Sequence, residues 1–344
     1  MGTPIWIIIF IISLLVLLKA SDYFIDGAER LGLYFNIKPF VIGVFVLGFG
    51  TSLPELVISI ISTIKKSSEI VIGNVLGSNI TNIFLVLAVA AIIVKKSRIH
   101  FDFLEFDLPL FITSSFLIVV TIWDGVFNIT DGLFFLLIFT IYIIYTVSNH
   151  QKTKRIIPEK LKEIEKEKLK PIPKTSRYNL KTLSLKIYHL AKKGRGVNWL
   201  TVAKLVVSPV FICLGAHYIV EAAINLSQIL NIGTDIIAAS AIALGTSLPE
   251  LSISFATLKK GKIDEMLGNI IGSNIFNILI VMGIPALISD LIIPQRVITT
   301  ILPIMLVAVI ICFVIIYDKK ITRWEGIILL ILYISYLGVI FGVF

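Results

Sequence analysis

The sequence predicts an all-α polytopic membrane protein with ten transmembrane helices that form two inverted five-helix repeats. Three observations carry this prediction: 57% of the 344 residues are hydrophobic, only 15% are charged, and a polar motif near residue 50 recurs near residue 245. Soluble domains contain about 25% charged residues, so this composition cannot cover a water-soluble surface. Soluble enzymes, nucleic-acid-binding proteins and disordered scaffolds are therefore disfavoured.

Ten apolar segments fit the length of a membrane-spanning helix, which needs about 20 residues. In the first half of the chain they lie near residues 4–20, 39–63, 69–94, 107–123 and 128–148. In the second half they lie near residues 198–220, 235–258, 264–289, 297–317 and 324–343. Turns are expected around Asp124, Gly125 and Asp290. Because each half has an odd number of spans, the second half must enter the membrane in the opposite sense.

The charge pattern divides the chain into three parts: a first repeat over 1–148, a basic loop over 149–196 and a second repeat over 197–344. The loop contains fifteen Lys or Arg and four Glu, so the other 296 residues carry a net charge of minus two. The connections on the side of this loop hold 27 Lys or Arg, and the opposite side holds three. The positive-inside rule then predicts a multi-pass protein of the cell membrane with a cytoplasmic loop and both termini outside. RNA or acidic-lipid binding is the less favoured interpretation of the loop.

Three residues of the apolar segments have side chains that could react or carry protons, but the sequence favours a structural role for each of them. Cys213 and Cys312 lie in apolar runs without a CxxC spacing, which predicts core packing. His217 is expected to be packed or hydrogen-bonded rather than to carry protons.

An internal repeat is the most informative feature of the sequence. GTSLPEL at 50–56 recurs at 245–251, and the same offset of 195 aligns GNVLGSNITNI at 73–83 with GNIIGSNIFNI at 268–278. Eighteen of the 34 aligned pairs between 50 and 83 are identical without a gap. In inverted-repeat transporters the substrate site lies near the midplane where the two halves meet, on helices interrupted by Gly or Pro.

Glu55 and Glu250 are the candidate charged ligands. A carboxylate at the centre of a spanning helix costs roughly 2.5–3.5 kcal/mol, and neither span supplies a Lys or Arg to pair with it. Two such residues brought together would form a site of charge minus two, which suits a hard cation with oxygen ligands. A cationic substrate would therefore supply the missing positive charge.

Hydroxyl and amide groups share a helical face with these carboxylates. Thr51 and Ser52 precede Glu55 by four and three residues, and Ser78 precedes Asn82 by four. Pro54 and Pro249 are expected to free carbonyl oxygens of the preceding turn. The repeated glycines are expected to serve close helix packing, and they are Gly73, Gly77, Gly268 and Gly272.

The motif pair GTSLPE with GN(V/I)(L/I)GSN resembles the two α-repeats of the calcium/cation antiporter superfamily, specifically its sodium/calcium exchanger branch. This resemblance covers essentially the whole chain. It implies that Glu55 and Glu250 bind Ca²⁺ together with the backbone carbonyls of Thr51 and Thr246. It also implies Na⁺ sites lined by Ser52, Ser247, Ser78 and Ser273, by carbonyls around Gly48 and Ala243, and by Asn82 and Asn277.

The implied function is secondary active, electrogenic exchange of Na⁺ for Ca²⁺ by alternating access, in which the first and sixth spans slide over a fixed core. No enzymatic activity, cofactor or obligate protein partner is expected. The chain departs from the family pattern at one point, because members often have a carboxylate at one of the positions of Asn82 and Asn277. This departure leaves the ion stoichiometry and any K⁺ or H⁺ coupling open.

Three other functions compete with this interpretation. In a proton-coupled Ca²⁺ exchanger, Glu55 and Glu250 would carry protons, but the repeated hydroxyls favour Na⁺. A channel needs weak serial sites instead of one strong cage. An intramembrane hydrolase using Ser52 or Ser247 lacks a His or Lys base at helical spacing.

Overall fold

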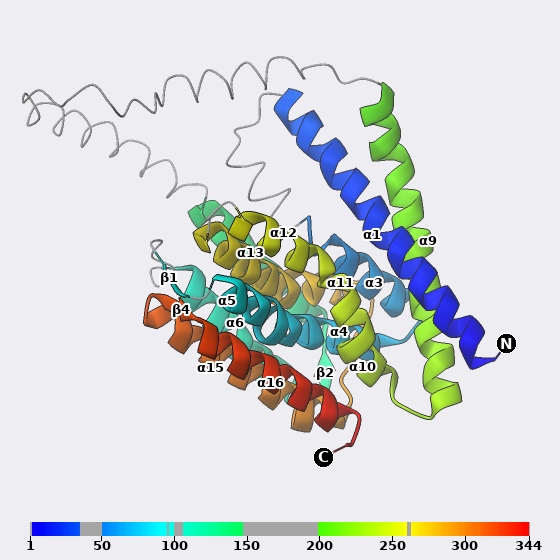
Figure 1. The fold of residues 1–344 in the computed structure, drawn as a ribbon. Coiled ribbons are helices and arrows are strands. Elements are labelled where there is room, and N and C mark those ends of the chain that lie inside the picture. Colours follow the sequence, from blue (N-terminus) through cyan, green and yellow to red (C-terminus); the bar gives the residue numbers. More distant parts are fainter. Residues whose placement is uncertain are drawn as a thin grey trace, which may run out of the picture.

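A computed structural model describes residues 2–34, 50–94, 96–99, 106–146, 199–259 and 263–343, and most of these residues lie in helices (Figure 1). Within these ranges, eight helices are long and apolar enough to cross a membrane, and two further apolar helices are shorter. All ten overlap the predicted spans. The part of the second span before residue 50 and the basic loop lie outside the described residues.

The first half begins with the long helix α1. The helical elements of this half, including the π-helix η2, are α1 (Thr3–Tyr34), α3 (Leu53–Ile64), α4 (Ser68–Thr81), η2 (Asn82–Leu87), α5 (Ala88–Val94), α6 (Asp107–Thr121) and an unlabelled helix Ile129–Thr146. The elements α4, η2 and α5 follow one another without a break and form a single span, Ser68–Val94.

The second half follows the same order of long and interrupted helices. Its helical elements, including the π-helices η3, η4 and η5, are α9 (Trp199–Leu230), α10 (Thr234–Ile237), η3 (Ala238–Ile242), α11 (Ala243–Thr246), α12 (Leu248–Lys259), α13 (Ile263–Phe276), η4 (Asn277–Val281), α14 (Gly283–Ala286), η5 (Val297–Ile301), α15 (Leu302–Tyr317) and α16 (Arg323–Ile340).

Helices α1 and α9 are each 32 residues long and extend at least ten residues beyond their predicted ends at residues 20 and 220. The prediction ended the first span at its charged residues, but these residues pair with one another. Lys19 lies 3.8 Å from Asp22, and Arg30 lies 3.0 Å from Asp26. Lys204 of α9 also pairs with Asp26. Because these opposite charges compensate one another, α1 and α9 remain helical through their charged residues.

The α1–α9 pair lies at one side of the bundle, where the two helices pack against each other and run in opposite directions (Figure 1). Much of the surface of both helices remains exposed, as expected for a face toward lipid. Cys213 of α9 is exposed, so its predicted core position is wrong, whereas Cys312 is buried as predicted. The reason is that α9 packs mainly on one face, and many apolar side chains on its other faces are exposed among the described residues.

A polar cluster connects α9 to α3. The Lys65 Nζ atom lies 3.3 Å from the Glu221 carboxylate and 3.5 Å from His217 Nε2, and it donates to the main-chain carbonyl of His217 at 3.3 Å. His217 is therefore hydrogen-bonded, as predicted.

Close helix packing through glycine is confirmed for Gly73 and Gly77 of α4. A Cβ atom at Gly73 would meet the carbonyl of Asp235 at 2.6 Å, and one at Gly77 would meet the carbonyl of Ala239 at 2.5 Å. Gly272 of α13 differs, because no described atom lies within 4 Å of an added Cβ. Shifting Ala239 by the repeat offset gives residue 44, which lies outside the described residues.

Two short antiparallel ribbons, which the sequence did not predict, join the two halves. Strand β1 (Lys96–Arg98) pairs with β4 (Lys320–Thr322), and β2 (Val126–Phe127) pairs with β3 (Leu291–Ile292). The offset of 195 maps β1 onto β3 and β2 onto β4, and it maps the partners 96 and 322 of one ribbon onto 291 and 127 of the other. Each ribbon thus exchanges strands between the halves with the same register. The predicted turn around Asp124 and Gly125 lies directly before β2, and Gly125 has a positive φ of 83°, which favours glycine.

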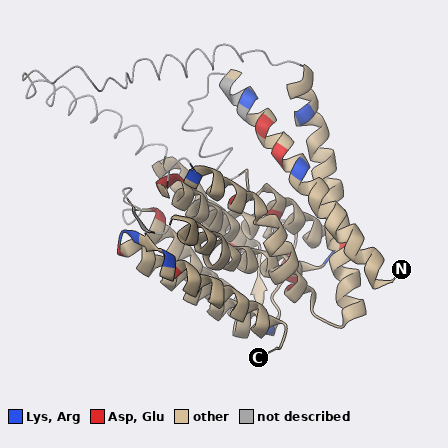
Figure 2. Ribbon diagram, viewed as in Figure 1, with Lys and Arg blue, Asp and Glu red and all other residues tan. Residues whose placement is uncertain are grey.

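The two ends of the bundle differ in charge. Figure 2 shows most described Lys and Arg residues toward the end of the bundle that holds β1 and β4. The start of α1 and the end of α16 lie at the opposite end (Figure 1).

Candidate functional site

Both GTSLPEL motifs start a helix after the same backbone turn. Ser52 has φ −89° and ψ 10°, and Ser247 has φ −80° and ψ 0°, so both occupy the bridge region between helix and strand. Pro54 lies in the first turn of α3, where a missing N–H is tolerated. The Gly50 carbonyl is not free, contrary to the prediction, because the amide of Leu53 donates to it at 3.2 Å. The turn itself, shared by both motifs, is what directs the side chains that follow.

Glu55 and Glu250 are fully buried, with 0% of each residue exposed. Neither forms a salt bridge with any described side chain. Both carboxylate oxygens of Glu55 and Oε2 of Glu250 also lack a hydrogen-bond donor among the described residues. A buried carboxylate without a partner is costly, so this pair needs a compensating positive charge.

Each carboxylate faces hydroxyl groups of the other motif. The Ser52 hydroxyl donates to Oε1 of Glu250 at 3.4 Å. Thr51 also lies beside Glu250, and Thr246 lies beside Glu55. The two motifs therefore cross near their serines, and the two glutamates interact electrostatically with each other. The structure brings together the two halves of the predicted site.

Helix α4 adds hydroxyl and amide groups to the same place. The Ser78 hydroxyl lies 3.5 Å from the Thr246 hydroxyl and 3.5 Å from the Asn74 side-chain oxygen. Asn74 in turn donates to the main-chain carbonyl of Glu55 at 3.4 Å. These contacts fix α4 against α3 and α11 at the level of the carboxylates.

The two repeated asparagines differ in their contacts, although both are fully buried. The Asn82 amide donates to Asn274 Oδ1 at 3.0 Å and to the Ser273 hydroxyl at 3.3 Å, which connects η2 to α13. Neither polar atom of the Asn277 side chain has a hydrogen-bond partner among the described residues. Asn82 Oδ1 likewise has no donor among the described residues, so the side-chain oxygen of each asparagine remains available to a cation.

The remaining predicted ligands fall into three groups. The hydroxyls of Thr51 and Ser247 are buried and without a hydrogen-bond partner in the described chain, so they are available to a ligand. The carbonyl of Ala243 already accepts the Ser247 amide at 3.1 Å and the Thr246 hydroxyl at 3.4 Å. Gly48 lies outside the described residues.

Asn74 and Asn274, which hold the network together, were not predicted as site residues. Their signal was the repeat itself, which places Asn at 74 and 269 and again at 79 and 274. The π-helices η2 and η4 were also missed, and they begin at the equivalent residues Asn82 and Asn277. Such π-helical turns frequently occur at functional sites.

The assembled site is chemically suited to a hard cation. It offers two carboxylates, several hydroxyls and side-chain amides, which are the oxygen ligands that Na⁺ and Ca²⁺ prefer. The described residues contain no group of three or more His, Cys, Asp or Glu side chains, so the two glutamates are a pair.

Comparison with known proteins gives a consistent family. The family model described as sodium/calcium exchanger protein matches residues 5–148 and 200–342. The sodium/calcium exchanger MaX1 of Methanosarcina acetivorans is 31% identical over 97% of this chain and 98% of its own length. The inner membrane protein YrbG of Escherichia coli is 32% identical over 82% of this chain and 79% of its own length.

A solved structure shows the same fold. The sodium-calcium exchanger NCX_Mj, soaked with Na⁺ and Sr²⁺, superposes with a TM-score of 0.61 and 27% identity, over 98% of this chain and 99% of the other. MaX1 and NCX_Mj are exchangers and not enzymes. The chain is therefore a multi-pass membrane cation antiporter that belongs to the sodium/calcium exchanger protein family.

Proposed function

We propose that the chain is a secondary active antiporter that exchanges Na⁺ for Ca²⁺ across the cell membrane by alternating access. The observation that carries this proposal is the pair Glu55 and Glu250, which are fully buried, come from opposite halves of the chain and have no cationic partner among the described residues. A cation that enters the site compensates both charges, and a cation that leaves must be replaced. This requirement couples the movement of one ion to the movement of the other.

The proposed ligands combine the two motifs with the helices α4 and α13. Ca²⁺ binds the carboxylates of Glu55 and Glu250 and the carbonyls of Thr51 and Thr246. Na⁺ uses the same carboxylates and the surrounding oxygen atoms of Gly48, Ser52, Ser78, Asn82, Ala243, Ser247, Ser273 and Asn277. The Ala243 carbonyl has a second lone pair for this purpose beyond the hydrogen bonds that it already accepts.

The exchange is proposed to be electrogenic. With Asn at positions 82 and 277, the side chains of the central site carry two negative charges, which balance one Ca²⁺ or two Na⁺. Any further Na⁺ would move with a net positive charge. The transport rate should then depend on the membrane potential.

The proposed architecture is ten transmembrane helices in two inverted five-helix repeats, 1–148 and 197–344, joined by the basic loop 149–196. Two findings support it: the ribbons β1–β4 and β2–β3 have equivalent registers under the repeat offset, and the motif helices α3 and α12 start near the centre and run to opposite ends (Figure 1). The clustering of basic side chains at one end supports a cytoplasmic loop and external termini (Figure 2).

The α1–α9 pair is proposed to slide over the remaining helices and to open the site to each side in turn. Only 28% of the most apolar stretch of each of these two spans is buried, in contrast to 72% in Ser68–Val94 and 83% in Ile263–Ala286. Arg323–Ile340 and Ile129–Thr146 are as little buried, at 28% and 17%, but each follows a strand of a ribbon that ties it to the other half. A pair with so little buried surface can shift at a lower cost than the helices that hold the site.

The test is Ca²⁺-45 uptake into proteoliposomes that contain the purified full-length chain. Uptake is measured with an outward Na⁺ gradient, with an outward H⁺ gradient and with neither, and a K⁺ diffusion potential is imposed with valinomycin. Glu55→Gln and Glu250→Gln keep the side-chain shape and remove the charge. Glu265→Gln, at an exposed position of α13, is the matched control.

The proposal expects uptake that requires the Na⁺ gradient, responds to the potential and is lost in both site variants but not in the control. Uptake driven by the H⁺ gradient alone would reassign the chain to proton-coupled Ca²⁺ exchange. Uptake without a gradient, or uptake that survives both site variants, would overturn the antiport mechanism.

A further inference from the structure

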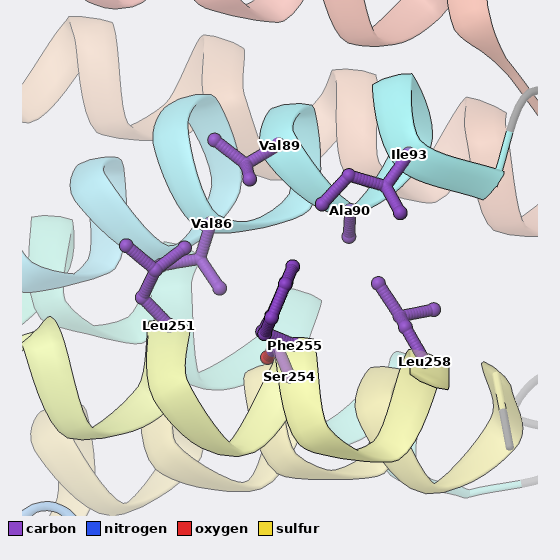
Figure 3. A pocket seen from close by; sticks show the side chains of 8 residues that line it. All are labelled: Val86, Val89, Ala90, Ile93, Leu251, Ser254, Phe255 and Leu258. Carbon is purple, nitrogen blue, oxygen red and sulfur yellow. The ribbon is translucent and has the colours of Figure 1, made fainter. Parts of the chain in front are cut away.

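A small pocket lies between α5 and α12, outside the set of predicted ligands (Figure 3). Its walls are apolar, with Val86 and Ile93 on the side of η2 and α5, and Leu251 and Leu258 on the side of α12. The one polar side chain that lines it is Ser254. Figure 3 shows the Phe255 ring between the two helices with the Ser254 oxygen beside its base.

The pocket begins next to the site. Val86 follows Asn82 by one turn of η2, and Leu251 follows Glu250 directly. From there both helices run toward the end of the bundle that holds β1 and β4 (Figure 1). The pocket therefore follows the two helices that leave the site in this direction.

Ser254 is placed one helical turn, or about 6 Å, beyond Glu250 on the same face of α12. Only 1% of this residue is exposed, and its hydroxyl has no hydrogen-bond partner among the described residues. A buried hydroxyl in a helix ordinarily donates to the carbonyl four residues earlier. Neighbouring residues do so: Thr257 donates to Ile253 at 2.9 Å.

The first repeat contains the same feature. Ser59, four residues after Glu55, aligns with Ser254 under the offset of 195. It is fully buried, and its hydroxyl also lacks a partner in the described chain. By contrast, Ser62 on the same helix donates to the Ile58 carbonyl at 2.8 Å. Two equivalent serines thus leave their hydroxyls unused, in helices that run to opposite ends of the bundle.

Resting on the antiport function proposed above, we propose that the pocket between α5 and α12 is the route by which a cation passes between Glu250 and the cytoplasmic face, with Ser254 as a transit ligand. Ser59 has the same role for Glu55 on the opposite face. Apolar walls oppose entry of a hydrated ion, and such constrictions act as gates. One hydroxyl within them replaces part of the ion's hydration without binding it tightly.

The first test is sided labelling of an introduced thiol in full-length protein. Ser254→Cys and Ser59→Cys are each made with Cys213→Ser, because Cys213 is exposed and Cys312 is buried. A membrane-impermeant methanethiosulfonate reagent is applied to either face of oriented vesicles, with and without Ca²⁺. The Cys213→Ser protein alone gives the background.

We expect the thiol at 254 to react from the cytoplasmic face and the thiol at 59 from the external face, and we expect Ca²⁺ to slow both reactions. Reaction of either thiol from the wrong face, no reaction from either face, or reaction rates unaffected by Ca²⁺ would overturn the proposal. This test still reports on the route if wild-type protein shows no Na⁺-driven Ca²⁺ uptake, so failure of the antiport function and failure of the route are distinguishable.

The second test measures the ion dependence of transport separately at each face. Ser254→Ala should raise the half-saturating Ca²⁺ concentration at the cytoplasmic face about fivefold, as expected for one lost neutral ligand, and leave the external value unchanged. Ser59→Ala should give the mirror result. Thr257→Ala and Ser62→Ala, whose hydroxyls bond within their own helices, should change neither value. Equal changes at both faces would indicate a structural role and contradict the proposal.

Discussion

The helices that hold the site and the α1–α9 pair differ in a way that reverses the rule for soluble proteins. The site helices Ser68–Val94 and Ile263–Ala286 carry many polar residues and are largely buried, whereas α1 and α9 are rich in large apolar side chains and are mostly exposed. In a bilayer, apolar surface is at no disadvantage outside, and polar groups must find partners inside. Burial in this protein therefore follows polarity and close packing.

This comparison predicts that a methyl group is least tolerated where the site helices touch. Gly77→Ala places a Cβ atom 2.5 Å from the Ala239 carbonyl, which is backbone and cannot rotate away. We expect a loss of stability of about 3 kcal/mol or more and loss of transport. Gly2→Ala, whose Cβ atom would meet Pro4 Cδ at an ordinary contact distance of 3.7 Å, is the control and should cost less than about 1 kcal/mol. Thermal unfolding of the two purified variants compares them, and equal losses would contradict this account of packing.

Both asparagines are proposed Na⁺ ligands, but only Asn82 also connects the site helices through its amide. Asn82→Ala removes the amide that donates to Ser273 and Asn274 and should lower the stability by about 1–3 kcal/mol. Asn277→Ala removes no hydrogen bond within the described chain, so it should leave the Tm unchanged. It should instead weaken ion binding, which is measured as a higher half-saturating Na⁺ concentration. A larger loss of Tm in Asn277→Ala than in Asn82→Ala would contradict the structural role given to Asn82.

The α1–α9 interface should tolerate the same added methyl group better than the site does. In Gly215→Ala the Cβ atom would lie 3.0 Å from the Leu17 Cβ atom and 3.0 Å from the Ser13 carbonyl. Because this pair is peripheral, a small displacement can relieve the contact, and we expect a cost of about 1 kcal/mol. Transport should nevertheless slow if the pair moves as proposed. An unchanged transport rate together with a lower Tm would argue against movement of this interface.

The smallest expected effect concerns the ion pair between Lys204 and Asp26. Both side chains are partly exposed, so Lys204→Met should change the stability by less than about 1 kcal/mol. Asp26 also pairs with Arg30, which keeps its charge compensated in the variant. A double-mutant cycle with Asp26→Asn measures the coupling. A coupling well above 1 kcal/mol would mean that the ends of α1 and α9 are held more firmly than their exposure indicates.

Much of the site was predictable because its chemistry is repeated in the sequence. Glu55 and Glu250 are carboxylates within apolar spans, and the gap-free offset placed them in equivalent helices that had to meet near the midplane. The structure brings them together with Ser52, Ser78 and Thr246, as expected. The hydrogen bond by which Asn74 connects α4 to α3 was not predictable, since its acceptor is a main-chain carbonyl on another helix.

The features that the sequence did not reveal depend on contacts between distant residues. The prediction ended the first span near residue 20, where charged residues begin, but Asp26 beyond that point is compensated by a lysine 178 positions later. The Gly50 carbonyl was predicted to be free because Pro54 has no N–H, and the amide of Leu53 satisfies it through a tighter turn. Local patterns identify the groups that need partners, but only the fold shows which partners they obtain.

The exchanged ribbons have a consequence for how the protein is made. Strand β1 is synthesised more than 220 residues before its partner β4, and β2 more than 160 before β3. During translation the first half therefore waits in the membrane with unpaired strand edges until the last helices are inserted. A half-chain expressed alone would keep those edges open, and an antiparallel second copy could pair with them in the same register. Under the inverted-repeat architecture proposed above, the present chain has the form of two such copies fused end to end.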